Sequence, residues 1–92
     1  MNTDTNKIKL SDKQKEVIRL MREGCEAAIS RGFYSGAWLQ MGKIGYGGKS
    51  YNVSSATLHA LIDKKIIENN KTSKSLSTSH FSLTELGQKI II

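Results

Sequence analysis

One stretch decides the fold of this chain, residues 53–67, which read VSSATLHALIDKKII. Leu58, Leu61 and Ile62 recur at spacings of three and four residues, so they would share one face of a helix. A serine at the start of the stretch can accept the unpaired amide protons of a first helical turn. The two isoleucines at its end are β-branched and favour a strand over more helix. The sequence therefore predicts a helix over residues 54–65 that leads straight into a strand.

The residues that follow this helix indicate a hairpin. Residues 69–75 are polar and turn-prone, and the stretch from His80 to Leu83 alternates polar with apolar side chains, as a half-buried strand does. Thr84 can cap a short final helix that runs to Lys89. A helix followed by a two-stranded hairpin is the core of a winged helix. The three isoleucines at the end of the sequence are expected to pack on the first helix, or to form a dimer seam.

The beginning of the chain predicts a disordered arm and one amphipathic helix. Residues 1–9 are polar and lack periodicity, which is typical of a frayed arm. Ser11 and Gln14 form a capping-box pattern, and the apolar residues that follow form one stripe, so a helix is expected over residues 11–23. The chain has 92 residues, which allows one modest core, so residues 10–92 are expected to form a single domain.

Residues 25–52 hold six of the eight glycines and the single tryptophan. Glycine at that density disfavours helix and suits turns. We therefore expect a short glycine-rich hairpin here, with strands near 27–33 and 37–41, in place of the second helix of a helix-turn-helix. The aromatic side chains of this region are expected to cover the edge of the core: Phe33, Trp38 and Tyr46. The fold class predicted for the whole chain is α+β.

The net charge is +6, and its distribution indicates the class of partner. Residues 30–52 carry three cations and no acid, and residues 64–80 carry four lysines against one glutamate. These two loop-rich segments flank the helix predicted over residues 54–65. Basic surface draws polyanions through the release of counterions. The charge therefore predicts a nucleic-acid partner, although many small proteins that bind none are also basic.

Two stretches resemble the second half of a winged helix-turn-helix domain of the bacterial regulator type. Residues 53–67 resemble the recognition helix of that family and its Leu-x-x-Lys-Gly-Leu-Ile ending, and residues 81–89 resemble the Tyr-x-Leu-Thr-x-x-Gly ending that follows the wing. The likeness covers residues 53–89. Lys65 stands where the family has glycine, the second helix is missing or displaced, and the recognition helix is about one turn short.

The resemblance implies a small non-enzymatic protein that binds duplex DNA, as a regulator of transcription or an accessory of a mobile element. The family places its helix in the major groove and its wing along the backbone. The residues expected to contact DNA come from the helix and from the two basic segments: Lys43, Lys49, Ser54, Ser55, Thr57, His59, Lys64, Lys71 and Lys74. The outward helix face, centred on Ala56 and Ala60, has no Arg, Asn or Gln to read bases. An alternative is therefore a protein-interaction or dimerisation module that uses this small, nearly neutral face or the isoleucines of residues 90–92.

The sequence gives no support for catalysis, a cofactor or a metal site. Cys25, His59 and His80 are isolated, without the spacing that metal ligation or nucleophilic catalysis needs. The end of residues 42–50 reads Gly-Lys-Ser like a phosphate-binding loop, but the glycine required five residues earlier is Lys43. No apolar run approaches the roughly 18 residues of a membrane span, no signal peptide is visible, and a lone cysteine cannot form an internal disulfide. A cytoplasmic location, with no membrane partner, is expected.

Overall fold

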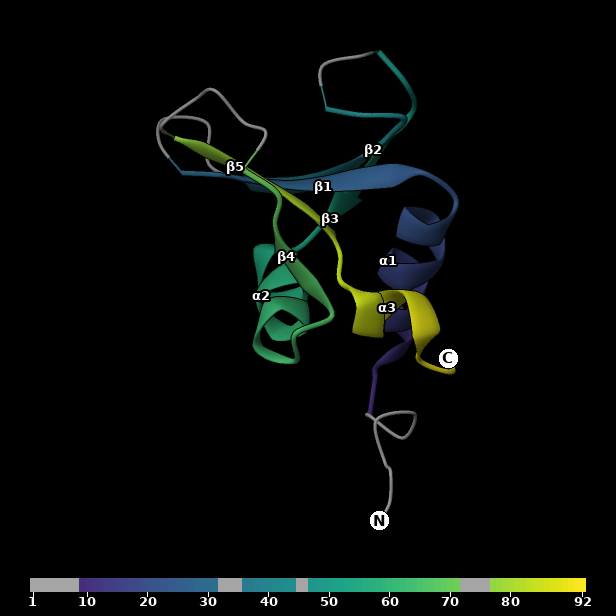
Figure 1. The fold of residues 1–92 in the computed structure, drawn as a ribbon. Coiled ribbons are helices and arrows are strands. Elements are labelled where there is room, and N and C mark those ends of the chain that lie inside the picture. The colour runs from purple at the N-terminus through teal and green to yellow at the C-terminus, as the bar shows by residue number, and fades with distance from the viewer. Residues whose placement is uncertain (1–8, 32–35, 45–46, 72–76) are drawn as a thin grey trace.

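The computed structural model describes residues 9–31, 36–44, 47–71 and 77–92. Within them the chain forms an α+β fold, as predicted, with three helices and five strands (Figure 1). The elements in chain order are α1 (Asp12–Arg22), β1 (Cys25–Ser30), β2 (Gly36–Met41), β3 (Ser50–Val53), α2 (Ser55–Asp63), β4 (Ile67–Asn69), β5 (Thr78–Leu83) and α3 (Glu85–Lys89). The strands form one antiparallel sheet in the order β3-β2-β1-β5-β4.

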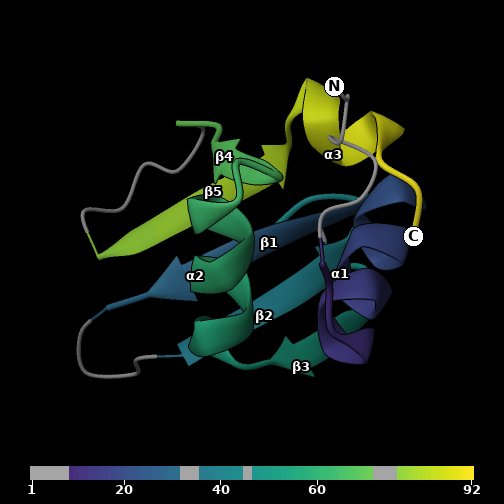
Figure 2. The same ribbon diagram turned by 90° about the horizontal axis from the view of Figure 1, so that it is seen from below.

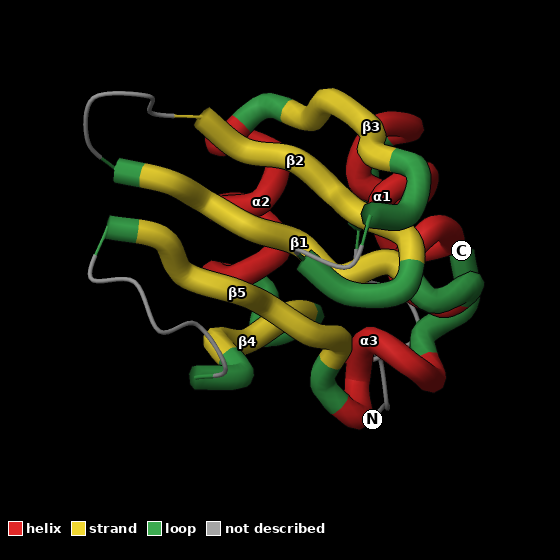
Figure 3. The backbone as a smooth tube through the Cα atoms, turned by 90° about the horizontal axis from the view of Figure 1, so that it is seen from above, coloured by secondary structure: helices red, strands yellow, loops and turns green. Residues whose placement is uncertain are grey.

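The helices α1 and α2 lie on one face of this sheet, and no described helix covers the other (Figures 1 and 2). Side chains alternate along the strands, so one set points toward the helices and forms the core with them. The fully buried members are Ile18, Leu39, Leu58, Leu61, Ile66, Ile67 and Ile90. We call the opposite side the helix-free face, and Figure 3 looks onto it. The strand residues that alternate onto it include Glu26, Ala28, Trp38, Asn52, His80 and Ser82.

The two longer helices begin where the sequence predicts. Ser11 Oγ accepts the amide of Gln14 at 3.2 Å, and Gln14 Oε1 accepts the amide of Ser11 at 3.1 Å, which completes the capping box of α1. Ser54 caps α2 in the same way, because its Oγ accepts the amide of Thr57 at 3.1 Å. These local bonds satisfy donors that have no partner inside the helix, so each helix start is specified by nearby sequence.

The C-terminal end of α2 is a Schellman motif with an unusual residue in it. The amide of Ile66 donates to the Leu61 carbonyl at 2.9 Å, and the amide of Lys65 donates to the Ile62 carbonyl at 3.0 Å. Lys65 has a φ of 64°, the left-handed region that favours glycine. This conformation explains the glycine of the winged-helix pattern at that position. It also turns the chain directly from α2 into β4.

The hairpin and the final helix follow as predicted. Strands β4 and β5 pair antiparallel, with Ile67 opposite Leu83, and Thr84 Oγ1 caps α3 by accepting the amide of Gly87 at 3.1 Å. A Cβ on Gly87 would lie 2.3 Å from the Ile66 carbonyl oxygen, so only glycine fits there. The expectation that the terminal isoleucines pack on the first helix holds for Ile90, which is buried in the core that α1 helps to form.

Two expectations need correction. The glycine-rich segment is followed by a further strand, β3, which the sequence analysis did not predict, and the two predicted hairpins join into one sheet through β1 and β5. Trp38 does not cover the edge of the core, because its strand neighbours Ala37 and Leu39 face the helices and the indole therefore lies on the helix-free face. The predicted arm, apart from its last residue, and the aromatic residues Phe33 and Tyr46 lie outside the described residues.

Candidate nucleic-acid interface

A hydrogen-bonded cluster on the helix-free face links two of the strand connections. At its centre is Glu26, whose Oε1 accepts the backbone amide of Ile44 at 2.9 Å and whose Oε2 accepts Asn70 Nδ2 at 2.6 Å. Asn70 Nδ2 also donates to Ser82 Oγ at 2.7 Å, and His80 Nδ1 lies 3.8 Å from Glu26 Oε1. The Glu26 side chain is only 11% exposed. One carboxylate therefore ties the connection after β2 to the connection after β4.

The two tied residues have lysines as chain neighbours. Lys43 precedes Ile44 and Lys71 follows Asn70, and both lysines are exposed. Two further exposed cations lie on connections between strands, and we call the set of four the cationic rim: Arg31, Lys43, Lys49 and Lys71. Within the described part of the chain, none of the four takes part in an ion pair. Lys49 Nζ lies over the Tyr51 ring, 5.2 Å from its centroid. A surface cation outside an ion pair is available to neutralise a phosphate.

The cationic rim occupies both ends of the sheet. Lys43 and Lys49 lie beyond the strand ends where Cys25 pairs with Met41, and Arg31 follows the opposite end, where Ser30 pairs with Gly36. Residues 42–44 and 47–49 rise from the sheet on the side away from the helices (Figure 1). Arg31, Lys43 and Lys71 of the rim therefore border the helix-free face, whereas the Lys49 side chain lies over Tyr51, which packs against the core on the helical side.

The helix predicted to read DNA lies on the other face of the sheet. Ser55 and His59 are exposed on α2. The hydroxyls of Ser54 and Thr57 lie 2.8 Å apart and serve the helix cap. Lys64, which ends α2, donates to Gln14 Oε1 of α1 at 3.3 Å.

The residues predicted to contact DNA therefore do not form one continuous surface. The sequence analysis places both basic segments beside the helix of residues 54–65. In the structure, residues 42–44 rise from the sheet away from the helices (Figure 1), and Lys49 Nζ lies over the Tyr51 ring on the helical side. Lys64 stays with α2, whereas Lys71 lies beside the residue that Glu26 holds. Lys74 lies outside the described residues.

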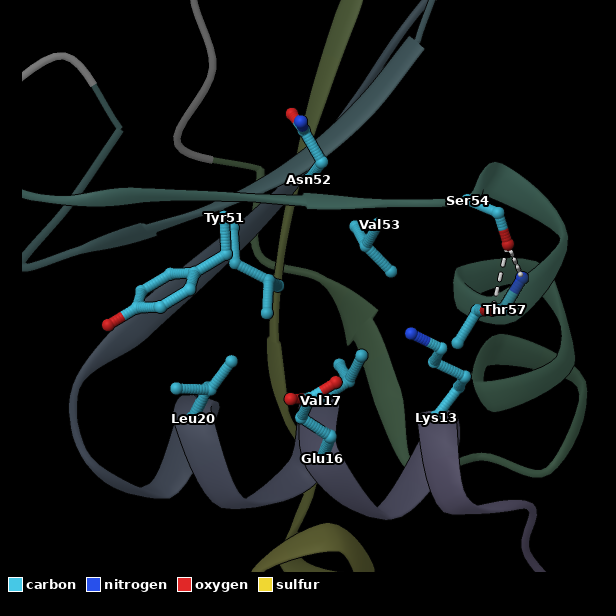
Figure 4. Close-up of a pocket in the computed structure, with 10 residues that line it drawn as sticks. Lys13, Glu16, Val17, Leu20, Tyr51, Asn52, Val53, Ser54 and Thr57 are labelled. Carbon is cyan, nitrogen blue, oxygen red and sulfur yellow. Dashed lines mark hydrogen bonds between the residues drawn. The ribbon is translucent and has the colours of Figure 1, made fainter.

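A groove opens on the helical side of the sheet, between α1, β3 and the start of α2 (Figure 4). Its volume is about 430 Å³. The floor is apolar, with Val17, Leu20 and Val53 directed into it, and Lys13 and Glu16 line it with opposite charges. Because these charges offset each other, the groove does not add to a surface for polyanions.

No group of three His, Cys, Asp or Glu side chains among the described residues could hold a metal ion. Cys25 is buried, and burial, with a smaller contribution from Glu23, raises the pKa of its thiol, which disfavours the reactive thiolate. No described helix is long and apolar enough to cross a membrane.

Two residues of the candidate interface were missed by the sequence analysis. Glu26 is not singled out there, because its role depends on partners 18 and 44 residues away. Arg31 was counted in the charge but not among the contact residues. The local signal for Glu26 is a lone acid between the buried residues Cys25 and Ala27, since such an acid must lie on the opposite side of the strand.

Comparisons with protein-family models, with curated proteins and with solved structures gave no match for this chain.

Proposed function

We propose that this chain is a non-enzymatic DNA-binding protein that holds the phosphate backbone with the cationic rim. The observation that carries the proposal is the Glu26 carboxylate, which fixes two lysine-bearing connections to one place on the sheet. A buried acid that accepts two hydrogen bonds holds Ile44 and Asn70 in position without presenting its charge to the ligand. The net charge of +6 adds attraction at long range.

The winged-helix resemblance gives a second arrangement of the same function. In it α2 would enter the major groove of duplex DNA and the hairpin β4–β5 would act as the wing. The element order from α2 through β4 and β5 to α3, and the exposure of Ser55 and His59, favour this arrangement. In this arrangement the protein would act in a reducing cytoplasm, as a regulator of transcription or as an accessory of a mobile element.

The protein-interaction alternative has less to support it. Ala56 is exposed but Ala60 is half-buried, and Ile91 is the exposed large hydrophobic residue among those described, at 71%. A single exposed isoleucine does not form a patch of the size that marks an interface.

The experiment that tests the proposal is a salt-dependent binding titration. Fluorescence anisotropy of labelled duplex and single-stranded oligonucleotides would give affinity from about 20 to 200 mM salt for the wild type and for Lys43→Ala/Lys71→Ala. If both lysines neutralise phosphates, the double variant loses roughly 1.4 to 1.8 units from the slope of log affinity against log salt.

The matched control is Lys13→Ala/Lys65→Ala, which removes two exposed cations from the helical side. We expect it to leave the slope nearly unchanged. A larger loss of slope in the helical pair than in the rim pair would support the winged-helix arrangement instead, in which Lys71 of the β4–β5 hairpin would still contact the backbone. If the wild type binds neither oligonucleotide at the lowest salt, the proposal is wrong.

A further inference from the structure

We propose that the helix-free face binds a single-stranded stretch of nucleic acid, with an unpaired base stacked on Trp38. This inference rests on the proposed function, and it names the form of nucleic acid that the rim holds. Trp38 is the only tryptophan of the chain. Trp38 is half-buried and lies outside the hydrophobic core. Its chain neighbours in β2 face that core: Leu39 belongs to it and Ala37 packs against it. Tryptophan carries a large apolar ring that usually contributes to a core, so its placement on this face needs another explanation.

The neighbours of Trp38 leave space for a flat ring on the sheet. It lies opposite Ala28 of β1 and Asn52 of β3, and His80 of β5 lies on the far side of Ala28. Ala28 has no exposed surface even though no described helix covers it, so larger neighbouring groups must close over it. An indole lying against so short a side chain would turn one ring face outward. Asn52 is exposed beside it and can hydrogen-bond the edge of a base.

The cationic rim is placed to hold phosphates on both sides of such a base. Trp38 is the third residue of the six-residue strand β2, with Lys43 beyond one end and Arg31 across the connection at the other. Six strand residues span roughly 20 Å. An aromatic platform between cations is the arrangement with which proteins bind single strands, because the cations follow the backbone and the ring stacks on a base of any type.

The stacking requirement distinguishes a single strand from a duplex. In a duplex each base is paired and stacked between its neighbours, and only its edges are exposed in the grooves. A ring face of Trp38 can be covered only by a base that has left that stack. The proposal covers single-stranded DNA and RNA alike, since both offer a base face and a phosphate backbone.

The lone tryptophan makes a direct test possible, because its fluorescence reports on Trp38 alone. The wild type is titrated at low salt with oligo(dT), oligo(U) and a duplex of equal length. We expect saturable quenching by a single strand, at lower concentration than any quenching by the duplex. The comparison of oligo(dT) with oligo(U) tells which sugar is preferred.

Two substitutions separate stacking from charge. Trp38→Leu should weaken single-strand binding, measured by anisotropy of a labelled oligonucleotide, by about 5- to 150-fold, and Trp38→Phe should retain most of it. Gln88→Ala, at an exposed position of α3 that takes part in neither proposal, should bind as the wild type does. Thermal unfolding of each variant verifies that it folds. If Trp38→Leu does not fold, the stacking proposal is tested by the affinity of Trp38→Phe relative to the wild type and by the quenching titration.

The outcomes separate this inference from the proposed function. Binding that depends on Lys43 and Lys71 but leaves Trp38 fluorescence unchanged, with Trp38→Leu binding as tightly as the wild type, would overturn the stacking proposal and leave the phosphate contacts intact. Tighter binding of the duplex than of either single strand would also overturn it. If no oligonucleotide binds, both proposals are lost together.

Discussion

The carboxylate of Glu26 and the side-chain amide of Asn70 are joined by a hydrogen bond of 2.6 Å that spans strand β5. Glu26 lies near the start of β1 and Asn70 directly follows β4, so the bond fixes where the β4–β5 connection leaves the sheet. The same carboxylate holds Ile44 of the β2–β3 connection. The position of two lysine-bearing segments therefore depends on one acidic residue.

Replacing Glu26 by alanine should weaken DNA binding, although it removes a negative charge. Removal of an acid normally raises the affinity of a protein for a polyanion, so the sign of the change tests the positioning role. The loss of two hydrogen bonds to a buried carboxylate should also lower the free energy of unfolding by about 2–4 kcal/mol. Anisotropy titration and urea denaturation measure the two effects.

The conservative variant Glu26→Gln is the control for this test. Its amide oxygen can still accept one of the two hydrogen bonds, so its affinity should lie between those of the wild type and Glu26→Ala. If both variants bind DNA more tightly than the wild type, Glu26 acts only as a repelling charge and the positioning role is wrong.

Replacing Lys65 by glycine should stabilise the protein. Lys65 has a φ of 64°, and a residue with a side chain is strained there whereas glycine is not. Because glycine also loses more backbone entropy on folding, the expected net gain is about 0.5–1 kcal/mol. Thermal unfolding gives the result, with Lys65→Ala as the control that removes the charge but keeps the strain. An equal gain from alanine would mean that the charge, and not the backbone, is responsible.

Replacing Gly87 by alanine should destabilise the protein by about 2 kcal/mol or more. The added Cβ would lie 2.3 Å from the Ile66 carbonyl oxygen, so backbone must move where α3 meets the end of α2. Gly36→Ala is the matched control, because a Cβ there meets nothing within 4 Å. A similar small change in the melting temperature for both variants would contradict the close contact.

The single thiol should make stability depend on pH in the alkaline range. Burial raises the pKa of Cys25 above its ordinary value of 9.0, and Glu23 adds to the effect. The unfolded thiol therefore loses its proton at a lower pH than the folded thiol, so the stability associated with it is present below about pH 9 and falls as the pH rises through the folded pKa. In Cys25→Ala this part of the decline should disappear from melts recorded between pH 8 and 11. An identical decline in both proteins would exclude the thiol as its source.

The parts of the fold that the sequence predicts are those specified by residues close together in the chain. Helices α1 and α2 have their caps in Ser11 and Ser54 and their apolar faces at helical spacing, so their existence and starts could be predicted. The final helix likewise has its predicted cap in Thr84.

The parts that could not be predicted depend on contacts between distant residues. The pairing of β1 with β5 joins Ala27 to Phe81, and no local pattern specifies which hairpin edges meet. That pairing brings the β4–β5 hairpin, with Lys71, to the edge of the β1–β2 hairpin, whose own register puts Trp38 and Glu26 on one face. It also places α2 on the other side of the sheet. The charge of the basic segments was therefore visible in the sequence, but the surface they form was not.

The most direct measurement of the central claim is an amide chemical-shift titration of the protein with a short oligonucleotide. Binding at the helix-free face predicts that the largest shifts fall on Ile44, Asn70 and the indole N–H of Trp38, with small shifts over residues 54–65. The largest shifts over residues 54–65, with Trp38 and Ile44 unmoved, would contradict it and assign the contact to α2.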